Sequence, residues 1–126
     1  MSGRITWLGG SHAFGFQIGE LRALQDETNS GPGEVLSRLN AGSWRVDDIT
    51  STLRLGLVGG GLSDADASAV ITRVTAGSDA NWFTLALTAS SVLSSGLFGN
   101  PDAPPEKPEG ESLEDGISAP STDGAA

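Results

Sequence analysis

The stretch from Ala80 to Asn100 contains no charged side chain, and this feature limits the fold of the chain more than any other. The spacing predicts a helix over about residues 80–97, with apolar side chains around most of its circumference. These side chains are Trp82, Phe83, Leu85, Ala86, Leu87, Ala89, Val92, Leu93, Leu97 and Phe98. A membrane span needs about 20 predominantly apolar residues. Serines and threonines interrupt the apolar run here, so we predict no membrane span.

A helix of this kind is normally buried on several sides, but a small domain has little other protein with which to bury it. Two interpretations follow. The helix is either the central core helix of the domain, or one of its faces binds another chain, which is a partner or a second copy. The uncharged side chains of Thr84, Thr88, Ser91 and Ser95 form a stripe at helical spacing that fits either interpretation.

The acidic residues and the prolines are concentrated at the C-terminal end of the sequence. Residues 100–126 hold seven of the 16 acidic residues and five of the six prolines, with Leu113 and Ile117 as the only large apolar residues. Such a segment buries too little apolar surface to offset the entropy lost on ordering its backbone. We therefore predict a folded domain over residues 1–99 and a disordered acidic Pro-rich tail over residues 100–126. The tail is interpreted as a solubilising segment, with a docking or spacing segment as the alternative.

The pattern of residues 1–99 predicts an α+β fold that is mainly α, with an N-terminal β-hairpin packed on about five short helices. Alternating side chains over residues 4–17 predict the hairpin, with its turn at Gly9-Gly10-Ser11 and with Phe14 and Phe16 on the return strand. The helices are expected at about 18–28, from Pro32 to the break at 40–42, at about 45–58, from Ser63 to before Gly77, and at about 80–97. Ile18 and Val46 are expected on the apolar stripes of the first and third helices.

The inventory of chemically reactive residues is small. The chain has no cysteine, so thiol chemistry and disulfides are excluded, and its one histidine, His12, leaves no His-based dyad, triad or multi-histidine metal site within one chain. The formal net charge of −9 and the scattered arginines argue against binding to nucleic acid. Because no basic segment followed by an apolar run opens the sequence, a signal peptide is not expected. The lack of cysteine fits a reducing cytoplasm.

Three patterns resemble functional motifs, but each has a simpler structural explanation. The pairs Asp47-Asp48 and Asp64-x-Asp66 could contribute to a cation site, yet both lie where a helix N-terminus favours acidic residues. The run Gly56–Gly61 resembles a phosphate loop but lacks the lysine and the Ser/Thr pair, and a helix stop explains it better. We therefore predict no enzyme, no catalytic residue, no cofactor and no metal site.

The sequence resembles the gene transfer agent tail-assembly chaperone family over about residues 13–98. Two motifs carry the resemblance: E-L-R-x-L-Q at Glu20–Gln25, and W-R-V-D-D-I at Trp44–Ile49 followed by L-R-L-G-L-x-G-G-G at Leu53–Gly61. Proteins of this family are encoded in the tail modules of phage-like gene transfer agents of alphaproteobacteria. The acidic tail departs from the shorter pattern of the family.

The resemblance implies a non-enzymatic role in virion assembly. A member of this family is expected to bind the tape-measure protein and to help tail-tube subunits polymerise around it in the cytoplasm. A groove or face that takes a partner helix requires exposed apolar anchors. We place the candidate partner-binding residues on the charge-free helix, namely Trp82, Phe83, Leu87 and Leu93, and we consider self-association through residues 80–97 as well. Trp44 is expected to have a structural role beside the third helix.

Two other functions stay open from the sequence. The protein could be a structural tail component retained in the particle, although a β-rich sequence would be expected for such a subunit. It could also be a small cytoplasmic adaptor unrelated to particles.

Overall fold

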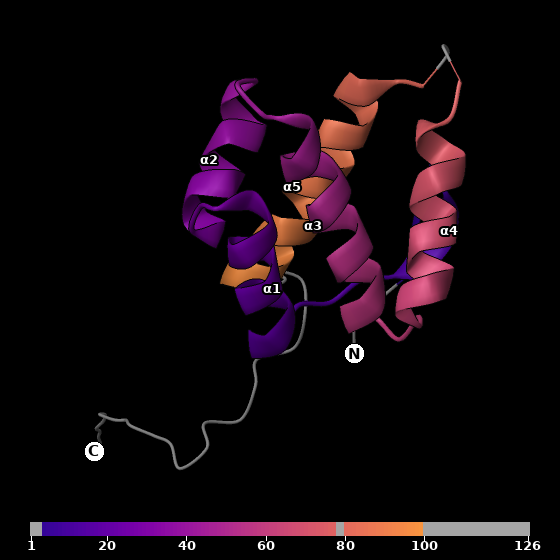
Figure 1. The fold of residues 1–126 in the computed structure, drawn as a ribbon, viewed down its shortest axis with the longest axis horizontal. Helices are drawn as coiled ribbons and strands as arrows, with labels where there is room; N and C mark the ends of the chain where they lie inside the picture. The colour runs from indigo at the N-terminus through magenta and orange to yellow at the C-terminus, as the bar shows by residue number, and fades with distance from the viewer. Residues whose placement is uncertain (1–3, 78–79, 100–126) are drawn as a thin grey trace, which may run out of the picture.

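A computed structural model describes residues 4–77 and 80–99 of the chain (Figure 1). Within these residues the chain forms one two-stranded antiparallel sheet and five α-helices, which confirms the expected fold class. The elements are β1 (Arg4–Trp7), β2 (Gly10–Ala13), α1 (Ile18–Thr28), α2 (Pro32–Ala41), α3 (Val46–Gly59), α4 (Asp64–Thr75) and α5 (Trp82–Phe98). The predicted tail, residues 100–126, lies outside the described residues, so the domain boundary after residue 99 stays a prediction.

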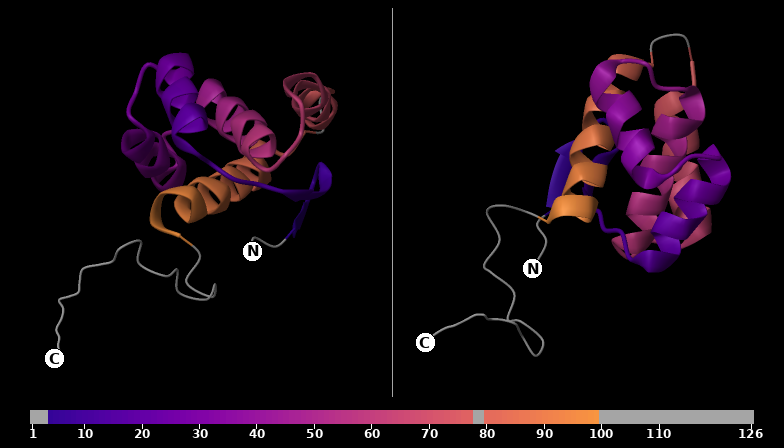
Figure 2. Two further views of the ribbon diagram at one scale, coloured as in Figure 1. Left: turned by 90° about the horizontal axis from the view of Figure 1, so that it is seen from below. Right: turned by 90° about the vertical axis from the view of Figure 1, so that its left-hand side faces the viewer.

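The helix α3 is at the centre of the arrangement. It packs against α1, α4 and α5, and α2 closes the remaining side by packing mainly on α5. Figure 2 shows two layers, with α1 to α4 in one layer and α5 with the hairpin behind them. Short loops join α1 to α2, α2 to α3 and α3 to α4, and each of these consecutive pairs is in contact.

The helix boundaries follow from local sequence signals. The backbone N–H of Gln17 donates to Glu20 Oε1 at 2.9 Å at the start of α1, and Asn29 ends that helix in the left-handed region with φ 55°. Pro32 occupies the first turn of α2, where its missing N–H costs nothing, and Gly42 ends α2 with φ 81°. These signals explain why the predicted helix ranges agree closely with the observed ones.

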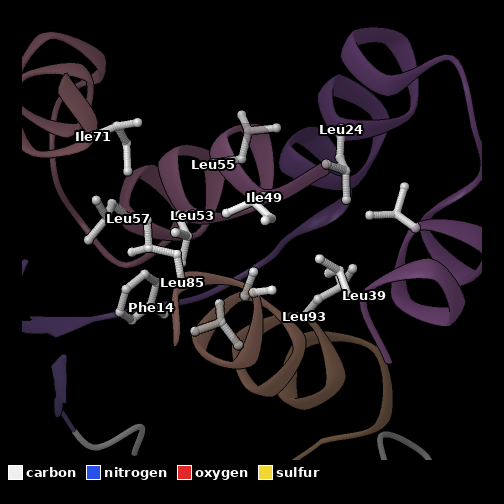
Figure 3. Close-up of a cluster of buried hydrophobic side chains, with 14 of the residues drawn as sticks. Phe14, Leu24, Leu39, Ile49, Leu53, Leu55, Leu57, Ile71, Leu85 and Leu93 are labelled. Carbon is white, nitrogen blue, oxygen red and sulfur yellow. The ribbon is translucent and has the colours of Figure 1, made fainter. Parts of the chain in front are cut away.

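The hydrophobic core lies between α3 and the helices around it. Figure 3 shows Leu53 and Leu85 meeting between α3 and α5, while Leu55 points to the opposite side of α3. Leu53 and Leu85 are fully buried, and Leu55 is buried as well. Apolar burial of this kind stabilises a domain by about 25 cal/mol per Å². Two predictions about the apolar stripes were wrong, since Ile18 and Val46 are exposed. Each lies in the first turn of its helix, before that helix reaches its neighbours.

The hairpin is shorter than the sequence predicted. Trp7 pairs with Gly10, so the turn consists of Leu8 and Gly9, and the return strand ends at Ala13. Beyond it the backbone N–H of Gly15 donates to the carbonyl oxygen of Gly56 on α3 at 2.9 Å. Phe14 and Phe16 therefore leave the ladder, because the chain has turned to cross the C-terminal end of α3.

Glycines make room for this crossing. A Cβ on Gly56 would lie 2.9 Å from the ring of Phe14, and a Cβ on Gly96 would lie 2.7 Å from the ring of Phe16. Cβ atoms on Gly59 and Gly60 would lie 2.0 Å from the carbonyl oxygens of the crossing segment. The sequence indicated only a helix stop here, but these glycines also form the surface on which residues 13–16 pack.

A buried ion pair fixes α2 to α3. Arg38 on α2 donates from Nε and Nη2 to the two carboxylate oxygens of Asp48 at 2.8 and 2.7 Å, and the backbone N–H of Arg45 donates to Asp48 at 2.8 Å. Burial by itself raises the pKa of Asp48, but the bonds from Arg38 and Arg45 and their positive charges outweigh this effect and lower it. The Asp47-Asp48 pair is thus explained by helix capping and by this ion pair.

Candidate partner-binding face

The side chains of α5 divide into a buried face and an exposed face. The buried face packs on α2 and α3 and consists of Leu85, Ala86, Ala89, Val92 and Leu93. The opposite face, which we call the outer face of α5, consists of Phe83, Leu87, Ser91, Ser95 and Phe98. Successive members of the outer face are three or four residues apart, so they form one continuous strip along the helix.

Large apolar side chains on the outer face are strongly exposed. Phe83 is 71% exposed, Leu87 is 72% exposed and Phe98 is 77% exposed. No charged side chain lies anywhere on this helix, so the strip is apolar and hydroxyl-bearing along its full length. Contiguous exposed apolar surface of this kind is typical of contact sites for other proteins.

The aromatic ring of Phe83 is held from one side by Trp44. The two rings meet edge to face, with centroids 5.5 Å apart and an interplanar angle of 74°. Trp44 is half-buried and packs against the core from the loop between α2 and α3. Phe83 is therefore a positioned aromatic side chain, which lowers the entropy that it would lose on binding. The sequence predicted a structural role for Trp44 but not this contact with α5.

The N-terminal half of α5 is itself anchored to the domain. The side chain of Asn81 caps the helix by accepting a hydrogen bond from the backbone N–H of Thr84 at 3.0 Å. One turn below Leu87, the hydroxyl of Ser90 donates to the side-chain oxygen of Asn40 at the end of α2. The outer face thus lies on a rigid element, as a recognition surface requires.

The four predicted partner-binding residues fall in different environments. Phe83 and Leu87 lie side by side on the outer face, one helical turn apart. Trp82 is half-buried and packs against the core, and Leu93 is fully buried. Leu93 cannot contact a partner in this structure, so the surface considered below contains Phe83 and Leu87 but not Leu93.

Sequence reasoning did not select Phe98, which completes the outer face at the end of α5. The signal was present, because Phe98 continues the three- and four-residue spacing that starts at Phe83 and Leu87. The predicted hydroxyl stripe forms one margin of this face, with Ser91 and Ser95 exposed and Thr84 and Thr88 half-buried.

His12 has a structural environment in the hairpin. Its Nδ1 accepts a hydrogen bond from the indole Nε1–H of Trp7 at 2.9 Å. Burial, followed by the positive charges of Arg4 and Arg73, lowers the pKa of His12, so the imidazole is neutral at pH 7. The histidine is half-buried in β2.

The second acidic pair is also explained by the fold. The hydroxyl of Ser63 accepts a hydrogen bond from the backbone N–H of Asp66 at 3.1 Å and caps α4. Asp64 forms an ion pair with Arg54, which bridges it to Glu27 on α1. Within residues 4–77 and 80–99, no group of three His, Cys, Asp or Glu side chains is placed to hold a metal ion.

A polar pocket of about 240 Å³ lies between α3 and α4. Its lining consists of Thr50, Ser51, Arg54, Ser68, Ile71 and Thr72. The one cation in this lining, Arg54, is already paired with two carboxylates, so the pocket offers no free charge to an anionic ligand. We therefore consider the outer face of α5, and not this pocket, as the candidate functional surface.

None of the helices in the described part of the chain has both the length and the apolar character that crossing a membrane demands.

Comparisons with known proteins identify the family of the chain. No curated protein and no solved structure matches the chain significantly. A family model described as "Phage tail tube protein, GTA-gp10" matches residues 2–99. Because this match covers most of the sequence, the chain belongs to that family of gene transfer agent and phage tail proteins.

Proposed function

We propose that this protein is a non-enzymatic tail-assembly chaperone that binds the tape-measure protein through the outer face of α5. In this role it keeps the tape-measure protein soluble in the cytoplasm while tail-tube subunits polymerise around it. The observation that carries the proposal is the pair Phe83 and Leu87, two large apolar side chains one turn apart on a rigid and charge-free helix face. The family match supports a partner among phage tail components.

The chemistry of the outer face favours a helical partner. An amphipathic helix binds through apolar side chains at intervals of three, four and seven residues, and the outer face has the same periodicity. Since α5 contributes no charge, the contact gains its energy from apolar burial and from the aromatic anchor Phe83. Such a contact tolerates many partner sequences, as a chaperone of a long helical protein requires.

Co-purification of tagged tape-measure protein tests this proposal. The double substitution Phe83→Ser with Leu87→Ser is expected to lower the affinity more than about tenfold, because two central apolar anchors are lost. Ile18→Ser is the matched control, since it removes an exposed large apolar side chain from α1. Binding of the double variant at the wild-type level, with both variants folded by thermal unfolding, would contradict the proposal.

A structural tail component is the second candidate, because the matching family is described as a tail tube protein. Its mainly helical fold, with a single two-stranded sheet in the described residues, favours the chaperone role over that of a β-rich tube subunit. Quantitative mass spectrometry of purified particles distinguishes the two. A chaperone is expected at far below one copy per tube subunit, and a copy number comparable to that of tube subunits would establish the tail component. The family match favours both of these roles over an adaptor unrelated to particles.

A further inference from the structure

The outer face of α5 has large side chains towards its ends and small side chains between them. Leu87 and Phe98 are large and apolar, and they are 72% and 77% exposed. Ser91 and Ser95 lie between them and are exposed as well. Figure 2 shows α5 at the outside of the domain, in the layer that it shares with the hairpin. Because the distance between two packed helices depends on the side chains at the contact, the serines allow another helix to approach closely.

The order of these four side chains makes the outer face complementary to itself. In two antiparallel helices, Ser91 of one copy can face the partner's Ser95. Leu87 then lies opposite Phe98 of the partner subunit, because Leu87 is four residues before Ser91 and Phe98 is three residues after Ser95. The mismatch of one residue is about 1.5 Å along the helix. A two-fold axis repeats both contacts, as a dimer with one shared patch requires.

The electrostatics of α5 favour the antiparallel orientation. Its first turn has no acidic residue and its last turn has no basic residue, so no side chain offsets the partial charges of the helix ends. These partial charges are about +0.5 at the N-terminus and about −0.5 at the C-terminus. Antiparallel copies bring opposite ends together, whereas parallel copies bring like ends together. The formal net charge of −9 lies outside α5, so side-chain charge on the two contacting helices does not oppose the association.

We propose that two copies of the chain associate through their outer faces, with the two α5 helices antiparallel and Leu87 packed against Phe98 of the partner subunit. This dimer rests on the proposed function in one respect, since its role is to cover Leu87 until the tape-measure protein replaces the second copy.

The size of the contact makes the dimer weak and reversible. From Leu87 to Phe98 the helix spans about 17 Å, and its diameter with side chains is about 10 Å. A stable interface between separate chains buries about 800 Å² on each partner, which is well above what one helix face of this length provides. A partner helix that also contacts Phe83 buries more apolar surface and displaces the second copy.

Sedimentation equilibrium of the full chain tests for the dimer. The average mass of the wild type is expected to rise from 12.8 kDa towards twice that value between about 10 µM and 1 mM protein. Phe98→Ser is expected to weaken the association more than about tenfold, because the two-fold axis uses this anchor twice. Ile18→Ser is the matched control, since it removes an exposed large apolar side chain from α1, and it is expected to associate as the wild type does.

The absence of cysteine allows a test of the orientation. Ser91→Cys and Ser95→Cys are prepared as separate proteins, one of them with a tag that changes its mass, and are mixed under oxidising conditions. The disulfide between positions 91 and 95 is expected to exceed the share of about one half that random pairing gives, since the antiparallel register joins these positions. Ala69→Cys, at an exposed position of α4, is the control and is expected to remain largely without a disulfide.

Three outcomes overturn the proposal. The first is a mass that stays at 12.8 kDa up to about 1 mM, and the second is equal association of Phe98→Ser and the wild type. The third is a disulfide that joins position 91 mainly to position 91, which would identify a parallel pair.

The two proposals fail separately, because none of these measurements contains tape-measure protein. A monomeric chain that binds the tape-measure protein overturns the dimer alone, and a dimer that does not bind it overturns the proposed function alone. If both hold, adding the tape-measure protein is expected to lower the yield of the disulfide between positions 91 and 95 at least twofold.

Discussion

The helices α3 and α5 differ in burial in the opposite sense to what their sequences suggest. The sequence of α3 contains Asp47, Asp48 and Arg54, yet eight of its 14 residues are buried. The sequence of α5 contains no charge, yet five of its 17 residues are buried. The helix at the centre of the domain is therefore the more polar of the two.

The difference shows that the apolar character of a helix does not by itself place it in the centre. The position of α3 follows from its contacts on several sides with α1, α4 and α5, and its one fully buried charge, Asp48, is paired with Arg38. In contrast, α5 packs mainly on α2 and α3, and the large apolar side chains of its outer face, Phe83, Leu87 and Phe98, stay more than two-thirds exposed. This apolar surface, which the fold does not need, is the reason for placing a binding function on α5.

The largest change in stability is expected when leucines on opposite sides of α3 and α5 are replaced with alanine. Leu53 and Leu55 on α3 are both buried, so replacing either with alanine is expected to lower the free energy of unfolding by about 2–5 kcal/mol. On α5, the buried Leu85 is expected to lower the free energy of unfolding by a similar amount when it is replaced with alanine. Replacing the exposed Leu87 with alanine is expected to change the free energy of unfolding by less than about 0.5 kcal/mol. Urea denaturation of the four variants measures these values. A loss of more than 2 kcal/mol in Leu87→Ala would show that both sides of α5 are buried in solution.

A somewhat smaller effect is expected from the buried charge of α3. Asp48→Asn leaves Arg38 without its carboxylate partner and is expected to cost about 3 kcal/mol at pH 7. The pKa of Asp48 is lowered in the folded protein, so its stabilising contribution is complete above the unfolded value of about 4 and is lost as the pH falls through the lower folded pKa. The difference between wild type and variant should therefore shrink below about pH 4. Denaturation curves from pH 7 to pH 2 check this, and a difference that stays constant would contradict the ion pair as its source.

The smallest change in stability is expected from a glycine at the C-terminal end of α3. Gly59→Ala places a Cβ within 2.0 Å of the backbone oxygen of Gly15, so the crossing segment must shift, at a cost of about 1–3 kcal/mol. The control Gly33→Ala lies in α2 with open space around the added Cβ and is expected to stabilise the protein by about 0.5–1 kcal/mol. Thermal unfolding compares the two variants. A stabilising Gly59→Ala would mean that the glycine serves only to end the helix.

Most of the fold was predictable because local signals coincide with apolar periodicity. Pro32, Gly42, Ser63 and Gly99 lie at or next to the ends of predicted helices, and the structure has ends there. The predicted hairpin was too long because Phe14 and Phe16 alternate with small residues, a pattern that is typical of a strand. The long-range hydrogen bond from Gly15 to Gly56 that ends the strand leaves no local pattern in the sequence.

The candidate site was predicted in part. The sequence identified α5, with Phe83 and Leu87, because its lack of charge is visible without a structure. It could not distinguish Leu87 from Leu93, since both are leucines on a helix that is apolar nearly all round. It also could not pair Trp44 with Phe83, because these residues are far apart in the chain.

The sequence by itself determined which segments are helical, where most of them end, and that one helix carries no charge. These properties depend on backbone conformation and side-chain type over a few residues, and so they are readable locally. The tertiary structure decided which helix is central and which face of α5 is exposed. Those properties depend on contacts between segments far apart in the chain, where packing and the pairing of Asp48 with Arg38 outweigh the apolar character of any single helix.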